Sequence, residues 1–196
     1  MPRPVVVVPH DRRWAERAAQ LIAALREHTG EVAERIEHIG STAIPGMAAK
    51  DVLDVQLSVA DLDRAAQALE EPLALLGFQA QPYVHDHVPA GSADDPGRWA
   101  KRVWARRDHP DGDANLHARV RGSPGERLAL LFRDWFRVRA EAVAAYSAFK
   151  VALAAEVVDV ERYSDLKDPV VDLVIVAAEQ WAAASGWRPE PPDTTG

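Results

Sequence analysis

The sequence predicts an α+β fold, in which a mixed β-sheet is flanked by helices and followed by a helical C-terminal part. Strand-like segments are concentrated in residues 1–122, and helical periodicity dominates residues 123–186. Hydrophobic residues make up 47% of the 196 residues, which is typical of a globular domain. The length suits a single domain over residues 1–186, followed by a Pro-rich flexible tail over residues 187–196.

The first predicted elements are a helix, a strand and a turn. The helix is capped by Asp11 and runs to about Thr29, where Gly30 is placed to end it. A strand follows over 32–39. Residues 40–47 then combine Gly, Ser, Thr and Pro, a composition that is typical of a turn.

The next elements are a second strand over 51–59, rich in Val and Leu, and a helix that Asp61 caps. That helix ends at about Leu76. A third strand is expected over 78–84, before a loop over 85–97.

The remaining elements are a hairpin and a set of helices. The turn residues from Asp108 to Asp113 lie between two strand-like segments and predict the hairpin. Helical periodicity then extends to about Glu156, with a break near Arg139. The predicted strands cover 99–106 and 115–121. The predicted helices cover 125–156 and 165–184.

Composition excludes several classes of protein. The chain has no cysteine, which excludes disulfides, thiol nucleophiles and cysteine-bound zinc. The apolar run Val5–Val8 is too short for a signal-peptide core or a membrane span, so we expect a cytoplasmic protein with no membrane partner. The net charge is −7, which makes nucleic acid an unlikely partner. Residues 98–121 are locally basic, which fits either a small anionic ligand or an edge strand guarded by charge.

The most informative run is His38–Gln56, where a strand, a Gly-Ser turn and a second strand follow one another. Phosphoryl transfer requires metal-binding carboxylates, together with hydroxyl or backbone donors around phosphate. Gly40 allows close backbone approach, and Ser41 and Thr42 add hydroxyl donors where a helix begins. Asp54 lies on the next strand, as a metal ligand would. The alternative is a turn that caps a helix, with Asp54 merely exposed.

Other basic residues and histidines are weaker candidates. Lys50 is placed either to contact phosphate or to face solvent. Arg102 and Arg119 fall on the two hairpin strands, where they form a phosphate cradle or pair with acidic neighbours. The exposed pair of His85 and His87 would require a third metal ligand such as His117, and otherwise is solvated. Charged and tyrosine residues on the C-terminal helices are interpreted mainly as packing or ion-pair residues: Arg133, Asp134, Tyr146, Lys150, Tyr163 and Lys167.

The sequence resembles the GrpB-like family over about residues 8–184. The motifs that carry the resemblance are the run His38–Gln56, Asn115-Leu116-His117, Leu131–Arg137, Ala145–Lys150, and Tyr163 with Lys167. The resemblance implies a nucleotidyltransferase-like fold. It also relates the chain to the C-terminal domains of some dephospho-coenzyme A kinases.

The wider superfamily implies a site for two divalent metals, which follows a Gly-Ser turn and is held by three carboxylates. Mapped onto this chain, Gly40 and Ser41 fill the turn and Asp54 is the first carboxylate. The second position holds the neutral Gln56, and the later strand offers His117, beside an asparagine, in place of an acid. Two dications need anionic ligands, so these replacements disfavour a two-magnesium mechanism. Asp51 cannot fill the gap, because three residues along a strand place it on the opposite face from Asp54.

Two main functional hypotheses follow, beside a third in which the chain is a protein-interaction domain built on its C-terminal helices. In the first, the protein binds a nucleotide or phosphorylated small molecule and transfers a nucleotidyl group with a divalent metal such as Mg²⁺. Asp54 and Ser41 are then catalytic, and Asp54, Gln56 and His117 bind the metal. Phosphate is bound by Gly40, Ser41, Thr42, Lys50, Gln56, Arg102 and Arg119. In the second, the protein is a catalytically degenerate ligand-binding or accessory domain, which acts with a protein partner in coenzyme A synthesis.

Overall fold

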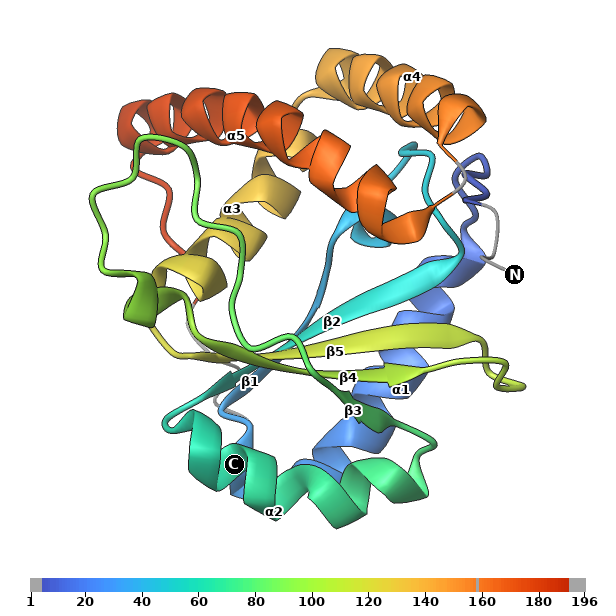
Figure 1. Cartoon of the computed structure of the whole chain (residues 1–196), viewed down its shortest axis with the longest axis vertical. Coiled ribbons are helices and arrows are strands. Elements are labelled where there is room, and N and C mark those ends of the chain that lie inside the picture. The colour runs from blue at the N-terminus through green and yellow to red at the C-terminus, as the bar shows by residue number, and fades with distance from the viewer. Residues whose placement is uncertain (1–4, 158, 191–196) are drawn as a thin grey trace.

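The centre of the molecule is a five-stranded mixed sheet (Figure 1). The structure is a computed structural model that describes residues 5–157 and 159–190. The strands lie in the order β1-β2-β5-β4-β3, with bounds Arg35–Ile39 (β1), Val52–Val59 (β2), Gln79–Gln81 (β3), Lys101–Arg106 (β4) and Asp113–Val120 (β5). β2 and β5 pair in parallel, and the other neighbouring strands are antiparallel. The predicted α+β class and mixed sheet are therefore confirmed.

Helices cover both faces of this sheet (Figure 1). One face carries α1 (Arg13–Thr29) and α2 (Leu62–Leu75). Above the other face lie α3 (Pro124–Arg137), α4 (Ala140–Glu156) and α5 (Val160–Ser185), which form the predicted helical C-terminal part. No helix in residues 5–157 and 159–190 has both the length and the apolar character that crossing a bilayer requires.

The helix ends follow local chemistry. The Asp61 carboxylate accepts a 2.7 Å hydrogen bond from the Arg64 backbone N–H and caps α2, as predicted. Asp11 acts differently, because it precedes the N-cap residue Arg12 and accepts from the Arg13 backbone N–H. The break predicted near Arg139 separates α3 from α4.

Several predicted segments have other bounds in the structure. Residues Gly30–Val32 form a 3₁₀ helix before β1, and α5 begins at Val160 rather than at 165. The third strand covers only Gln79–Gln81, and the chain then pairs with the start of β4 only through the isolated bridge between His85 and Ala100.

The tail predicted from 187 begins with a packed residue: the Trp187 indole donates to Asp134 at 3.2 Å and lies near the ring of Trp181. Residues 191–196 of that predicted tail lie outside the described residues.

Alternation along β2 and β5 separates an apolar face from a polar one. Alternate residues of β2, namely Leu53, Val55, Leu57 and Val59, are fully buried in the core formed with α1 and α2. The residues between them point to the opposite face. The parallel register pairs Asp54 with Asn115 and Gln56 with His117, so two rows of polar side chains run side by side beneath α3 and α5.

Candidate functional site

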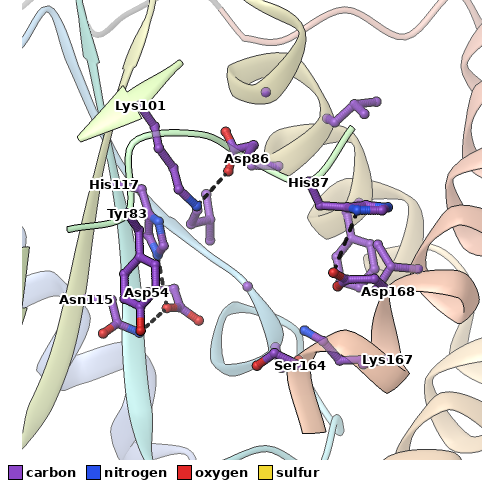
Figure 2. Close-up of a pocket in the computed structure, with 18 of the residues that line it drawn as sticks. Asp54, Tyr83, Asp86, His87, Lys101, Asn115, His117, Ser164, Lys167 and Asp168 are labelled. Carbon is purple, nitrogen blue, oxygen red and sulfur yellow. Dashed lines mark hydrogen bonds and ion pairs between the residues drawn. The ribbon is translucent and has the colours of Figure 1, made fainter. Parts of the chain in front are cut away.

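A pocket of about 650 Å³ lies between the polar face of the sheet and α5 (Figure 2). Asp54 and His117 line it from the sheet, and Lys167 and Asp168 line it from α5. The loop before β4 passes along the pocket and contributes several residues, including Tyr83.

The turn after β1 touches the carboxylate of β2. Gly40 has a φ of +69°, and a Cβ atom added there would lie 2.6 Å from Asp54 Oδ2. The register of β1 and β2 explains this contact, because Ile39 is paired with Asp54. A side chain at position 40 would therefore meet both backbone strain and the carboxylate.

A buried lysine from α4 reaches the same turn. Lys150 Nζ donates a 2.8 Å hydrogen bond to Ser41 Oγ and lies 5.0 Å from the centre of the Tyr146 ring. Burial, assisted by the charge of Lys167, lowers the pKa of Lys150 to about 7. The neighbouring Thr42 hydroxyl lies 2.9 Å from His38 Nε2.

Lysine is concentrated at this pocket. All four lysines of the chain line it: Lys50, Lys101, Lys150 and Lys167. Lys50 Nζ lies 5.5 Å from the centre of the Tyr163 ring, and burial lowers its pKa although Asp54 opposes the shift. Within the described part of the chain, Lys50, Lys150 and Lys167 form no ion pair with a carboxylate.

Asp54 is held in its ionised form. Its Oδ1 atom accepts a 2.8 Å hydrogen bond from Asn115 Nδ2 and lies 3.3 Å from His117 Nε2. Burial raises the pKa of Asp54, but His117, Asn115 and Lys50 outweigh that effect and bring the pKa well below its usual range. Burial lowers the pKa of His117, so we describe His117 as a neutral donor to Asp54.

A second carboxylate, Asp86, ties the loop to the sheet. It accepts two hydrogen bonds of 2.7 Å from the Arg119 guanidinium and one of 3.0 Å from Lys101 Nζ. These cations outweigh burial and bring the pKa of Asp86 well below its usual range. Arg119 also donates to Gln56 Oε1 at 2.7 Å, which leaves its guanidinium committed to protein acceptors.

The loop is also fastened to α5. His87 Nε2 lies 2.9 Å from Asp172 Oδ1, and its Nδ1 atom lies 3.7 Å from Asp168 Oδ2. The Ala90 backbone N–H donates to Asp172 as well, at 3.0 Å. Figure 2 shows His87 on the α5 side of the pocket, away from His117, so the two histidines do not form the predicted metal-binding set.

The donor atoms around Asp54 do not fit a two-metal centre. The side-chain oxygens of Asn115 and Gln56 accept from Arg107 and Arg119, respectively. Only Asp54 and His117 remain as ligands, and no group of three His, Asp or Glu side chains in residues 5–157 and 159–190 is placed to hold a metal. Beside the Gly40-Ser41 turn, lysines without an ion-pair partner and one carboxylate, Asp54, suit an anion better than two dications.

Comparison with known proteins identifies the family. The sequence pattern of the GrpB protein family matches residues 4–176. The chain belongs to the GrpB family. Among solved structures, the GrpB protein of Enterococcus faecalis superposes with a TM-score of 0.71 at 23% identity, covering 90% of this chain and 99% of that one. This likeness concerns the fold.

Several curated relatives of this GrpB chain are named as kinases. It is 36% identical to the dephospho-CoA kinase of Mycolicibacterium paratuberculosis over 200 residues, which is 95% of this chain but 49% of that kinase. The chain thus spans about half the length of such relatives. A UPF0157 protein of Streptomyces coelicolor is 31% identical, with 83% of this chain and 77% of that protein covered.

The structure places the predicted site residues of this GrpB chain in three different settings. Six line the pocket: Gly40, Ser41, Thr42, Lys50, Asp54 and His117. Arg119 also lines it but is held by Asp86, and Gln56 is fully buried between Arg119 and the Glu126 backbone. The expectation that Arg102 joins Arg119 is wrong, because Arg102 pairs with Asp63 of α2 on the opposite face of the sheet.

Sequence reasoning missed four residues of the pocket. Lys150 and Lys167 were interpreted as packing or ion-pair residues, although both belong to the motifs of the GrpB resemblance. Lys101 and Asp86 were not singled out at all. Consecutive residues of a strand face opposite sides of the sheet, so only one of Lys101 and Arg102 can face the pocket. The pairing of Lys101 with Arg119 places Lys101 on the pocket side.

Gly40 supports a first prediction. Gly40→Ala should lower the free energy of unfolding by about 1–3 kcal/mol, because the added Cβ meets Asp54 at a positive φ. Urea denaturation of the wild type, Gly40→Ala, Asp54→Ala and the double variant measures the coupling between the two sites. Asp54→Ala should relieve part of the loss. Strictly additive effects would contradict the proposed contact.

Lys150 supports a second prediction, on pH dependence. The pKa of Lys150 is about 7 in the folded protein against an ordinary value of 10.5, so between these values the unfolded chain holds the extra proton. Stability should therefore rise with pH across this window, by up to about 1.4 kcal/mol per pH unit from this one group.

Lys150→Met removes the titrating group and nearly preserves its volume. In urea denaturation at pH 7, 8 and 9, the wild type should gain stability relative to Lys150→Met at each step. A stability difference that stays constant with pH would show that Lys150 titrates normally.

Proposed function

We propose that the protein binds a nucleotide or another phosphorylated small molecule in the pocket beside the Gly40-Ser41 turn. One observation carries the proposal: Lys50, Lys150 and Lys167 converge on this pocket without a carboxylate partner among the described residues. Lys150 is buried and Lys50 and Lys167 are half-buried, so charges without a partner there are costly, and a bound phosphate would offset that cost. Ser41 and Thr42 would add hydroxyl donors.

The wall of the pocket formed by α3 and α5 is partly apolar, which favours an organic ligand over a free anion. Leu128 and Phe132 line it from α3, and Val171 and Ile175 line it from α5. Small-molecule sites typically combine such an apolar wall with a few polar groups that fix orientation. A phosphorylated ligand would place its phosphate by the lysines and its organic part along this wall.

The proposed role is ligand binding without a metal-dependent step. Nucleotidyl transfer by two magnesium ions would require further carboxylates beside Asp54, but the two expected positions hold Gln56 and His117. Asp54, hydrogen-bonded to Asn115 and His117, would support the site by packing against the adjacent Gly40 turn. The protein would thus be a catalytically degenerate relative of the nucleotidyltransferases.

A role beside a coenzyme A enzyme is supported by the names of the relatives. The chain matches about half of several proteins named dephospho-CoA kinase, including those of Mycolicibacterium paratuberculosis and Mycobacterium tuberculosis. The chain would then act together with such a kinase activity in an accessory role. Dephospho-coenzyme A is accordingly a useful probe, along with ATP.

Calorimetric titration of ATP and of dephospho-coenzyme A tests the proposal. At least one should bind the wild type in excess EDTA, and Lys167→Met should weaken that binding about ten-fold or more, because a charge-assisted contact is lost. Arg98→Met is the matched control, since it removes one positive charge from an exposed surface pair and should change affinity less than two-fold.

Asp54→Asn separates binding from metal-dependent catalysis. Removing the negative charge should leave affinity unchanged or increase it, because Asp54 then no longer repels phosphate. If binding instead required Mg²⁺ and disappeared in Asp54→Asn, with pyrophosphate released by the wild type, the protein would be a metal-dependent transferase. If neither probe binds the wild type, the proposal is wrong.

A further inference from the structure

A second cleft, of about 780 Å³, lies on the α1 and α2 face of the sheet, opposite to the lysine pocket. Its walls are α1, the last turn of α2 and the connection between β4 and β5 (Figure 1). Two arginines line it, Arg17 from α1 and Arg106 from the end of β4. The proposed function makes no use of this cleft.

Arg106 is buried yet incompletely hydrogen-bonded. It is 5% exposed, and its guanidinium lies 5.0 Å from the centre of the Phe78 ring. Its Nε atom donates a 3.2 Å hydrogen bond to the Gly112 carbonyl oxygen. Its two Nη atoms have no hydrogen-bond acceptor within the described residues and are not among the buried atoms there, so they are open to the cleft and can donate to a ligand.

Arg17 repeats the pattern from the other wall. Its Nη1 atom donates a 2.7 Å hydrogen bond to Asp51 Oδ1, an atom that also accepts from the Trp14 indole at 2.8 Å. Its Nε and Nη2 atoms are buried and have no partner in the parts of the chain that are described. A Cβ added to Gly112 would overlap Arg17 Nη2, so both arginines lie against the same turn residue.

The nearby carboxylates do not complete these two groups. Asp51 is the partner of Arg17 through one oxygen, and the side chain of Asp111 is 75% exposed. Asp113 accepts from the Asp108 backbone N–H. Burial lowers the pKa of Arg106, an effect that the positive charge of Arg17 adds to and that Asp111 opposes. Arginine nevertheless stays protonated in proteins, so the half-buried Arg17 and the buried Arg106 bring two like charges to the same cleft.

We infer that this cleft binds a phosphate-sized oxyanion between Arg17 and Arg106. Such an anion supplies several acceptor oxygens in the geometry that guanidinium groups recognise, and its charge offsets the repulsion between them. The cleft also presents Leu21, Leu75 and Leu76. These apolar side chains could contact the organic part of a phosphomonoester. Inorganic phosphate and a phosphomonoester share the oxyanion that the two arginines would bind.

NMR titration of the whole chain with inorganic phosphate, at constant ionic strength against chloride, tests the inference. The Gly112 amide and the Trp14 indole N–H should show a saturable shift in the wild type. Arg17→Met should weaken the apparent affinity about ten-fold or more, and Arg17→Lys, which keeps the charge without the planar donor group, several-fold. The matched control is Arg13→Met, which removes an 80% exposed arginine of the same helix and should leave affinity within two-fold.

The outcomes separate this site from the lysine pocket. Lys167→Met should leave the Gly112 shift unchanged, and the same titration with phenyl phosphate shows whether an attached organic group tightens binding. The inference is overturned if the Gly112 and Trp14 signals do not saturate, or if phosphate shifts only signals of the Gly40-Ser41 turn. It is equally overturned if Arg13→Met and Arg17→Met behave alike.

Discussion

The parallel pairing of β2 with β5 is the constraint on which the rest of the structure depends. The two strands are far apart in sequence, and α2, β3, the loop and β4 are needed to connect them. Because the register is continuous from Val52 to Val59, alternate residues of both strands face the same way over their whole length. A shift of one residue would expose Leu53 and bury Asp54 in the apolar core. The core thus fixes the position of the polar face.

Polar groups on that face are satisfied in different ways along its length. At one end, Glu126 of α3 is buried and bonds to the Ser58 hydroxyl and the Gly122 backbone. In the middle, Arg119 and Asp86 satisfy one another. At the other end, the lysines and Asp54 are grouped around open space. The polar residues at the first end and in the middle are bonded to one another and so maintain the fold. Those at the other end are exposed to the open space of the pocket.

The sequence allowed much of this arrangement to be predicted, because local signals mark it. Alternation in β2, the Asp61 cap and the Gly-Ser turn are all local features. The resemblance to the GrpB-like family added the link between the turn, Asp54 and His117. The face of Arg102 could not be predicted, because alternation within each hairpin strand does not give the register between them, which pairs Arg119 with Lys101 rather than with Arg102. Lys150 contacts Ser41, which is 109 residues away in sequence, and Asp86 contacts Arg119, which is 33 residues away. Local sequence patterns do not encode such distant contacts.

The confinement of lysine to one pocket has a consequence for chemical modification. Every basic side chain elsewhere on the surface, apart from histidine, is an arginine. Acylation of lysine, by an enzyme or by a reactive metabolite, therefore has no side-chain target outside this pocket. Each such event would remove a lysine charge from this pocket. Acylation of lysine side chains in this protein would therefore act on the charge of one pocket and on no other part of the surface.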